Sequence, residues 1–166
     1  MLDDTHAATQ NVDASGPYGE FGEHHRLIEE RRPTAEDQGG GRMARILIVD
    51  DDVVFLRVLA GLLTRKGHAV QTVERPRPAL VALDHECFDI LVSDVHMPEM
   101  DGFDLVREAR ERSKTMPAIL TSADAEEGMA MRCLAAGATA FVSKSAGFAA
   151  LCVALEDVLL ASANRA

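Results

Sequence analysis

The sequence predicts an α/β fold: a doubly wound, five-stranded parallel sheet with helices on both faces. From position 45 onward, short apolar runs alternate with segments of helical periodicity. Several runs are continuously apolar, which is typical of central strands covered on both sides. Together these patterns indicate five successive strand–helix units.

Each strand is predicted from its own apolar run. Residues 46–49, 90–92 and 118–120 are continuously apolar, so we expect them at the centre of the sheet. Residues 69–73 include two polar side chains, which suits an edge strand. The last strand is predicted at 140–143.

Helices are predicted between and after these strands. Gly67 and Gly137 stand directly after two of them, where a left-handed residue commonly ends a helix. Pro78 lies in the first turn of another, a position that tolerates proline. The expected helices are 53–66, 78–84, 103–112, 125–136 and about 148–160.

Residues 1–42 are predicted to be a disordered acidic tail, followed by a folded domain at 43–166. The tail has nine acidic residues, four Arg, no Lys and few branched apolar residues. Such a segment buries too little apolar surface to offset the entropy of ordering it. Because Met43 leads straight into the first strand, an alternative hypothesis is that Met43 is the true start and residues 1–42 are a mis-assigned extension.

The composition excludes several classes of function. A net charge of −10 argues against a dedicated nucleic-acid surface, which would need clustered Lys and Arg. No apolar run approaches the roughly 18–20 residues of a membrane helix, and no secretory signal opens the chain, so we expect a cytoplasmic protein without membrane insertion. Cys87, Cys133 and Cys152 lack zinc-site spacing and are expected to be buried or half-buried free thiols.

Chemically active side chains follow four of the predicted strands. Because the carboxyl ends of parallel strands meet at one edge of a sheet, we expect these side chains around one crevice. Each alone has a plainer role, such as capping a helix or ending a strand, but their joint placement favours a site. They are Asp50 and Asp51 after the first strand, Asp94 after the third, Thr121 and Ser122 after the fourth, and Lys144 after the fifth.

Clustered carboxylates need a positive partner. Two of them about 4 Å apart repel by roughly 4 kcal/mol at an effective dielectric near 20. Oxygen ligands select a hard cation, and few carboxylates with room for water and phosphate suit Mg²⁺. With the site neutralised by Mg²⁺ and Lys144, one carboxylate is placed to attack a phosphoryl group, and Ser122 to hydrogen-bond it.

Four motifs resemble the response-regulator receiver family. They are ILIVDDD at 46–52, DILVSDVHMPEMDG at 89–102, the stretch 117–123 that includes Ser122, and FVSK at 141–144. The resemblance runs from about residue 45 to about residue 160. It implies a flavodoxin-like (βα)₅ domain with strand order 2-1-3-4-5.

The resemblance also implies the central chemistry. Asp94 would accept a phosphoryl group from a histidine kinase, a phosphotransfer protein or a small phosphodonor. Asp51 and Asp94, with the backbone carbonyl of His96, would bind Mg²⁺, and Asp50 would hold the ion through water. The domain would then phosphorylate and dephosphorylate itself rather than act as a turnover enzyme.

Further roles follow from the same resemblance. Ser122 would move toward the phosphoryl group, Lys144 would pair with it, and Phe141 would take the place of the family's switching aromatic. His96 and Asp124, two positions after the acceptor and after Ser122, would set the lifetime of the phosphoryl group.

The chain departs from the family pattern at two positions. Ser145 follows Lys144 where the family usually has Pro. Phe141 lacks the hydroxyl of the frequent Tyr, so that switch would work through packing alone.

Only 22 residues follow Lys144, enough for one helix, so a stand-alone regulator is expected. Its output would pass to a downstream protein through the fourth helix, fifth strand and last helix, and a phosphorylation-dependent dimer is compatible with this. The main alternative is a degenerate receiver that binds partners without phosphorylation. A metal-dependent phosphohydrolase would need a second acid at position 96, where the chain has His.

Overall fold

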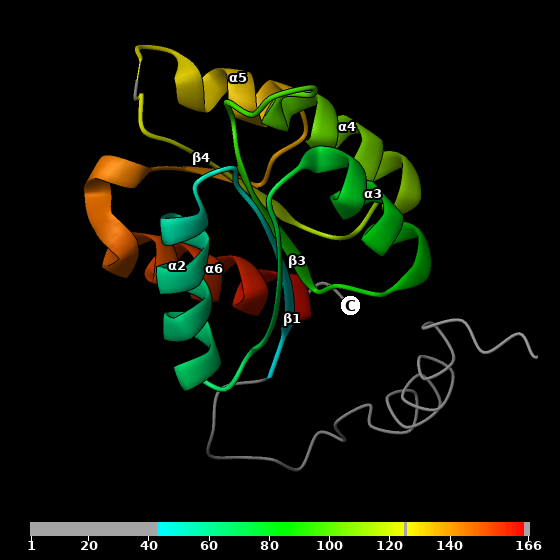
Figure 1. Ribbon diagram of the computed structural model, residues 1–166, viewed down its shortest axis with the longest axis vertical. Helices are drawn as coiled ribbons and strands as arrows, with labels where there is room; N and C mark the ends of the chain where they lie inside the picture. The colour runs from blue at the N-terminus through cyan, green and yellow to red at the C-terminus, as the bar shows by residue number, and fades with distance from the viewer. Residues whose placement is uncertain (1–42, 125, 165–166) are drawn as a thin grey trace, which may run out of the picture. The chain divides into compact units, whose positions relative to one another are not determined.

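The computed structural model describes residues 43–124 and 126–164 and has the predicted α/β architecture (Figure 1). The predictions for residues 1–42 lie outside the described residues. Strands and helices alternate along the described part. The strands are β1 (Arg45–Val49), β2 (Ala69–Val73), β3 (Ile90–Asp94), β4 (Ala118–Ser122) and β5 (Ala140–Ser143).

The helices begin and end at recognisable signals. The carboxylate of Asp52 accepts hydrogen bonds from the amides of Val54 and Phe55 at the first turn of α2, and Asp101 caps α4 in the same way. Gly67, with a φ of 93°, follows α2 at the left-handed position. The helices are α2 (Val53–Arg65), α3 (Pro76–His85), α4 (Gly102–Arg112), α5 (Met129–Ala135) and α6 (Gly147–Ala163), with a 3₁₀ turn η1 at Lys144–Ala146.

All neighbouring strands are parallel, and their order is β2-β1-β3-β4-β5, as the family resemblance implied. The prediction that residues 69–73 form an edge strand is confirmed. Val49 of β1 lies opposite Ser93 of β3, so the next residues, Asp50 and Asp94, come side by side at the carboxyl edge. Asp94 in turn lies opposite Thr121 of β4.

Helices cover both faces of the sheet (Figure 1). One core cluster joins α3, α4 and α5 to side chains such as Leu47 and Leu91, and the other joins α2 and α6 to side chains such as Ile46 and Ile90. Because successive strand residues point to opposite faces, a continuously apolar strand fills both clusters. Burying one such side chain stabilises the fold by about 1.5–3 kcal/mol.

Two predictions from the sequence were wrong. The helix expected at 125–136 is only Met129–Ala135, because Gly128 precedes it with a φ of 82°, a left-handed conformation that cannot belong to a right-handed helix. Cys87 is exposed rather than buried, whereas Cys133 and Cys152 are buried free thiols as expected.

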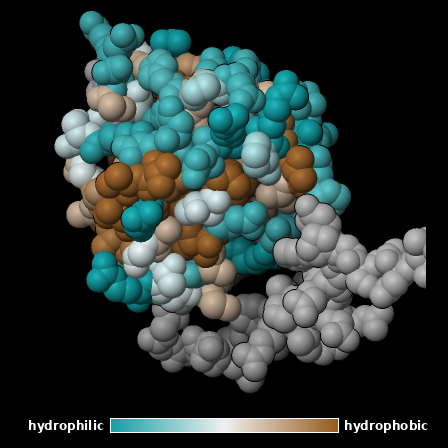
Figure 2. Space-filling view, in the orientation of Figure 1, coloured by the Kyte–Doolittle hydropathy of each residue, from teal (hydrophilic) through white to brown (hydrophobic). Residues whose placement is uncertain are grey.

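Helix α6 is apolar on more than its core-facing side. Leu151 and Leu155 pack into the second cluster, whereas Val153 and Leu160 are exposed. Figure 2 shows apolar side chains gathered over α2 and α6 on the viewed face. By length and composition alone, Lys144–Ala163 could cross a membrane, with a mean hydropathy of 1.8, but a core helix of a globular domain passes the same test.

Helix α4 begins in direct contact with the end of β3. A Cβ atom added to Gly102 would lie 2.2 Å from the carbonyl oxygen of Asp94 and 2.9 Å from a methyl group of Leu120. The amide of Gly102 donates to the carbonyl of Val95 at 2.9 Å, which closes the loop between β3 and α4. Glycine at position 102 therefore fixes the backbone around Asp94.

We predict that Gly102→Ala lowers the free energy of unfolding by about 2 kcal/mol or more, because the methyl group must displace backbone rather than a flexible side chain. Gly61→Ala is the matched control, since nothing lies within 4 Å of its Cβ in the middle of α2. That control is expected to raise stability by about 0.5–1 kcal/mol. Urea unfolding measures both variants, and equal effects would contradict the close approach at Gly102.

Candidate functional site

Asp94 is the last residue of β3 and is almost completely buried, with 6% of its side chain exposed. Its Oδ2 accepts a hydrogen bond of 2.8 Å from the amide of His96. The hydroxyl of Ser93 donates to the carbonyl of Asp94 at 2.9 Å, and the amide of Val95 donates to the carbonyl of Thr121 at 2.8 Å. The backbone on both sides of Asp94 is therefore held in place.

Asp50 directly follows β1, and 1% of its side chain is exposed. Its amide donates to the carbonyl of Val73 at 3.2 Å, and its Oδ1 accepts from the amide of Asp52 at 3.0 Å. Within the described residues, its buried Oδ2 makes no well-aligned hydrogen bond, and its polar contact is an ion pair.

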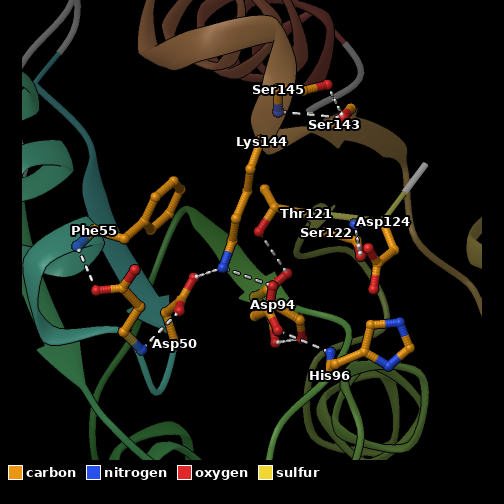
Figure 3. Close-up of polar contacts among 12 residues, drawn as sticks. Asp50, Phe55, Asp94, His96, Thr121, Ser122, Asp124, Ser143, Lys144 and Ser145 are labelled. Atoms are coloured by element: carbon orange, nitrogen blue, oxygen red, sulfur yellow. Dashed lines mark hydrogen bonds and ion pairs between the residues drawn. The ribbon is translucent and has the colours of Figure 1, made fainter.

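Lys144 joins the two carboxylates (Figure 3). Its Nζ lies 2.8 Å from Oδ2 of Asp50 and 2.8 Å from Oδ1 of Asp94, so these two oxygens are no more than twice that distance apart. Only 18% of the Lys144 side chain is exposed. The Lys144 peptide bonds are trans, because the described residues contain no cis peptide bond, although Ser145 stands in place of Pro.

The three charges do not balance, because two carboxylates share one ammonium. Burial raises the pKa of Asp50, and the nearby Lys144 and the amide of Asp52 only partly offset this. Burial also lowers the pKa of Lys144, but its contacts with the two carboxylates outweigh burial and raise that pKa. The cluster keeps a net negative charge and therefore favours a further cation.

Ser122 and Thr121 end β4 beside this cluster, and both are buried. The hydroxyl of Thr121 donates to the carbonyl of Ser93 at 3.3 Å. The hydroxyl oxygen of Ser122 accepts from the amide of Asp124 at 3.1 Å. In Figure 3, Ser122, Asp124 and His96 lie on the side of Asp94 away from Asp50. The side chains of Asp124 and His96 are exposed.

Phe141 lies in β5 opposite Leu120 of β4 and is half-buried against the first core cluster. Strand β4 separates it from Asp94 in β3. Ser122 lies opposite Ser143, two residues further along β5. Phe141 and Ser122 are therefore on adjacent strands, close to the same carboxyl edge.

The oxygen donors at this edge of the sheet are few. Within residues 43–124 and 126–164, no group of three or more His, Cys, Asp or Glu side chains is arranged to hold a metal, and Asp51 is exposed. Asp50 and Asp94 are nevertheless two buried carboxylates with one poorly satisfied oxygen between them. Mg²⁺ in proteins often binds through one or two carboxylates and keeps several waters, so this donor set fits the ion.

Sequence reasoning did not find one neighbour of the cluster. The ring of Phe55, in the first turn of α2, lies with its centroid 4.6 Å from Nζ of Lys144. No motif marks Phe55, and its position in a helix would have suggested a core residue. Its contact depends on how α2 packs against η1 and α6 in three dimensions.

Comparison with known proteins identifies the family. A family model described as the response regulator receiver domain matches residues 46–156. The chain belongs to this family. It is thus a response regulator receiver domain of two-component systems, and the recognition made from the four motifs is confirmed.

The chain is similar to parts of several kinds of longer protein. The transcriptional regulatory protein GlrR of Escherichia coli K12 is 35% identical over 120 residues, which are 72% of this chain and 27% of that protein. The sensor histidine kinase RcsC of Salmonella typhimurium is 36% identical over 99 residues, 60% of this chain and 10% of that one. The receiver therefore matches only a small part of these longer proteins.

Solved structures share the fold. A CheY-like receiver domain protein from Methanospirillum hungatei has a TM-score of 0.71 at 26% identity, covering 75% of this chain and all of that one. The chemotaxis protein CheY4 of Vibrio cholerae has a TM-score of 0.66 at 29% identity, covering 70% of this chain and 99% of that one.

We predict that Asp50→Asn raises the free energy of unfolding by about 1 kcal/mol at pH 7 in metal-free buffer. The substitution removes the charge of a buried carboxylate, and Lys144 remains paired with Asp94. The gain should shrink as the pH falls. Asp50 has a folded-state pKa above its ordinary 3.8, so as the pH falls the native wild type binds a proton on Asp50 before the unfolded chain does. This proton binding stabilises the native wild type and reduces its difference from Asp50→Asn.

Urea unfolding between pH 7 and pH 4 measures the difference between the two proteins. Asp157→Asn, which alters an exposed side chain on α6, is the control and should show no comparable gain. A loss of stability in Asp50→Asn at neutral pH would contradict the prediction.

Proposed function

We propose that this domain is phosphorylated on Asp94 and transmits its state by protein contact. The observation that carries the proposal is the buried carboxylate of Asp94, whose Oδ1 lies 2.8 Å from Nζ of Lys144 at the carboxyl edge of the sheet. A carboxylate held rigidly beside a cation can act as a nucleophile, and the cation can then stabilise the phosphoryl oxygens.

In the proposed reaction, an oxygen of Asp94 attacks the phosphorus of a phosphohistidine or of a small donor such as acetyl phosphate. The bond from phosphorus to the donor breaks, its electron pair leaves with the donor, and Asp94 becomes an acyl phosphate. Lys144 gives up its contact with the carboxylate of Asp94 and pairs with a phosphoryl oxygen instead. Ser122 accepts from the amide of Asp124, so its own proton is available for another phosphoryl oxygen.

Mg²⁺ is the proposed cofactor, and receiver domains generally bind it at an acidic pocket. In this chain Asp94, Asp51 and the backbone carbonyl of His96 would hold the ion, with Asp50 acting through water. When bound, Mg²⁺ supplies charge neutralisation and orients the phosphoryl oxygens.

The switch is proposed to involve Ser122 and Phe141 on adjacent strands. Movement of Ser122 toward the phosphoryl group opens space at the edge of the sheet, and the half-buried ring of Phe141 packs into it. The change reaches the surface of α5, β5 and α6, where a downstream protein or a second phosphorylated copy would bind.

The proposed partners upstream are a histidine kinase or a phosphotransfer protein, in the cytoplasm. Support comes from the relatives, which include RcsC and the sensory/regulatory protein RpfC of Xanthomonas campestris, 30% identical over 140 residues. A stand-alone organisation stays a prediction, as does the absence of nucleic-acid binding.

We predict that the wild type gains a phosphoryl group when incubated with Mg²⁺ and acetyl phosphate, and that Asp94→Asn does not. A phosphate-affinity gel and intact mass measure the product, and hydroxylamine should remove it, as expected for an acyl phosphate. Asp104→Asn, on the exposed side of α4, is the matched control and should be phosphorylated like the wild type. An unmodified wild type would favour the degenerate receiver, and labelling of Asp94→Asn would move the acceptor elsewhere.

His96→Ala and Asp124→Ala are predicted to change the rate of dephosphorylation by about three- to tenfold, with smaller effects on the extent of phosphorylation. Both side chains are exposed beside Asp94 and Ser122, where they control how water approaches the phosphoryl group. The decay of phosphorylated protein after removal of the donor gives the rate. Unchanged decay in both variants would rule out this role.

A further inference from the structure

Lys144 needs something to hold its side chain in place. Its four-carbon stem is flexible, and Ser145 replaces the usual Pro that would restrict the backbone after it. Lys144 opens the short 3₁₀ turn η1, and the hydroxyl of Ser143 just before the turn bonds to that of Ser145 within it at 2.7 Å. This turn fixes the backbone but does not touch the ammonium group.

An aromatic ring lies over the ammonium group instead. The centroid of the Phe55 ring is 4.6 Å from Nζ of Lys144, which is within the range of a cation–π contact. Figure 3 shows the ring beside the end of the lysine chain. The backbone of Phe55 is held at the start of α2, because its amide donates to the capping carboxylate of Asp52 at 3.1 Å.

A second ring supports the first. The centroids of Phe55 and Phe148 are 5.1 Å apart and their planes are tilted by 32°, a favourable aromatic arrangement. Phe148 follows Gly147, whose φ of 84° turns the chain into α6. Both rings are half-buried against the second core cluster, so α2 and α6 jointly position the ring over Lys144.

We propose that Phe55, supported by Phe148, is a positioning residue for Lys144. The ammonium group is held on three sides, by the carboxylates of Asp50 and Asp94 and by the face of the Phe55 ring. The ring limits access of water to the cation and keeps its donors directed at the carboxyl edge of the sheet. The effect of this placement on phosphorylation rests on the proposed function, whereas the placement itself does not.

Two variants separate the aromatic contact from simple packing. Phe55→Tyr keeps the ring, and Phe55→Leu keeps a large apolar side chain without it. Phe88→Leu is the matched control, because Phe88 is also half-buried beneath a cation, with the guanidinium carbon of Arg45 5.4 Å from its centroid, but remote from Lys144.

The first measurement needs no metal and no phosphodonor. The chain has three lysines, so the ε-methylene proton signals are few, and comparison with Lys144→Arg assigns that of Lys144. Ring currents from Phe55 should move this signal upfield in the wild type, in Phe55→Tyr and in Phe88→Leu. The shift should disappear in Phe55→Leu. A wild-type signal at the position of exposed lysines would overturn the proposal.

The second measurement is the initial rate of phosphorylation from acetyl phosphate with Mg²⁺. Phe55→Leu should be slower than the wild type by about three- to tenfold, the range expected for one cation–π contact, while Phe55→Tyr and Phe88→Leu stay within about twofold. Equal slowing in Phe55→Tyr and Phe55→Leu would assign the effect to packing and overturn the positioning role. If the wild type itself is not phosphorylated, the proposed function fails, and the ring-current shift still decides the placement.

Discussion

The ion pairs that Lys144 makes with Asp50 and Asp94 are the interaction on which the rest of the site depends. They connect the carboxyl ends of β1, β3 and β5, three strands that are far apart in the sequence. An exposed ion pair would contribute little, but here the carboxylates are almost fully buried and the ammonium is mostly so. Loss of the lysine would leave two buried negative charges without a partner, so the cluster constrains the strand ends strongly.

The fold supplies the rigidity that this cluster requires. Parallel pairing brings Asp50 and Asp94 side by side, and α4 begins so close to the carbonyl of Asp94 that no side chain fits at Gly102. The edge strand β5 then needs only a long side chain to reach over β4 to β3. Lysine has that length, and the ring of Phe55 restricts the freedom that comes with it.

Sequence patterns predicted the features that follow from local chemistry. Continuously apolar runs identified the central strands, and polar residues directly after them identified Asp50, Asp94 and Lys144 as neighbours. The start of α5 was wrong because a single left-handed Gly128 overrides an otherwise helical composition. The contact of Phe55 could not be predicted, because it depends on the packing of α2 against η1 and α6 and on no feature of the residues around it.

The charges explain why the site combines two buried carboxylates with one lysine. Asp50, Asp94 and Lys144 together carry one negative charge. Under the proposed function, phosphorylation of Asp94 would replace its single charge by about two, so the same three residues would then carry about two negative charges. A divalent cation would bring the first state to one positive charge and the second to about zero. Under the proposed function, both states would therefore stay within one charge of neutrality only with such a cation, and the second carboxylate beside Asp94 would help to hold it.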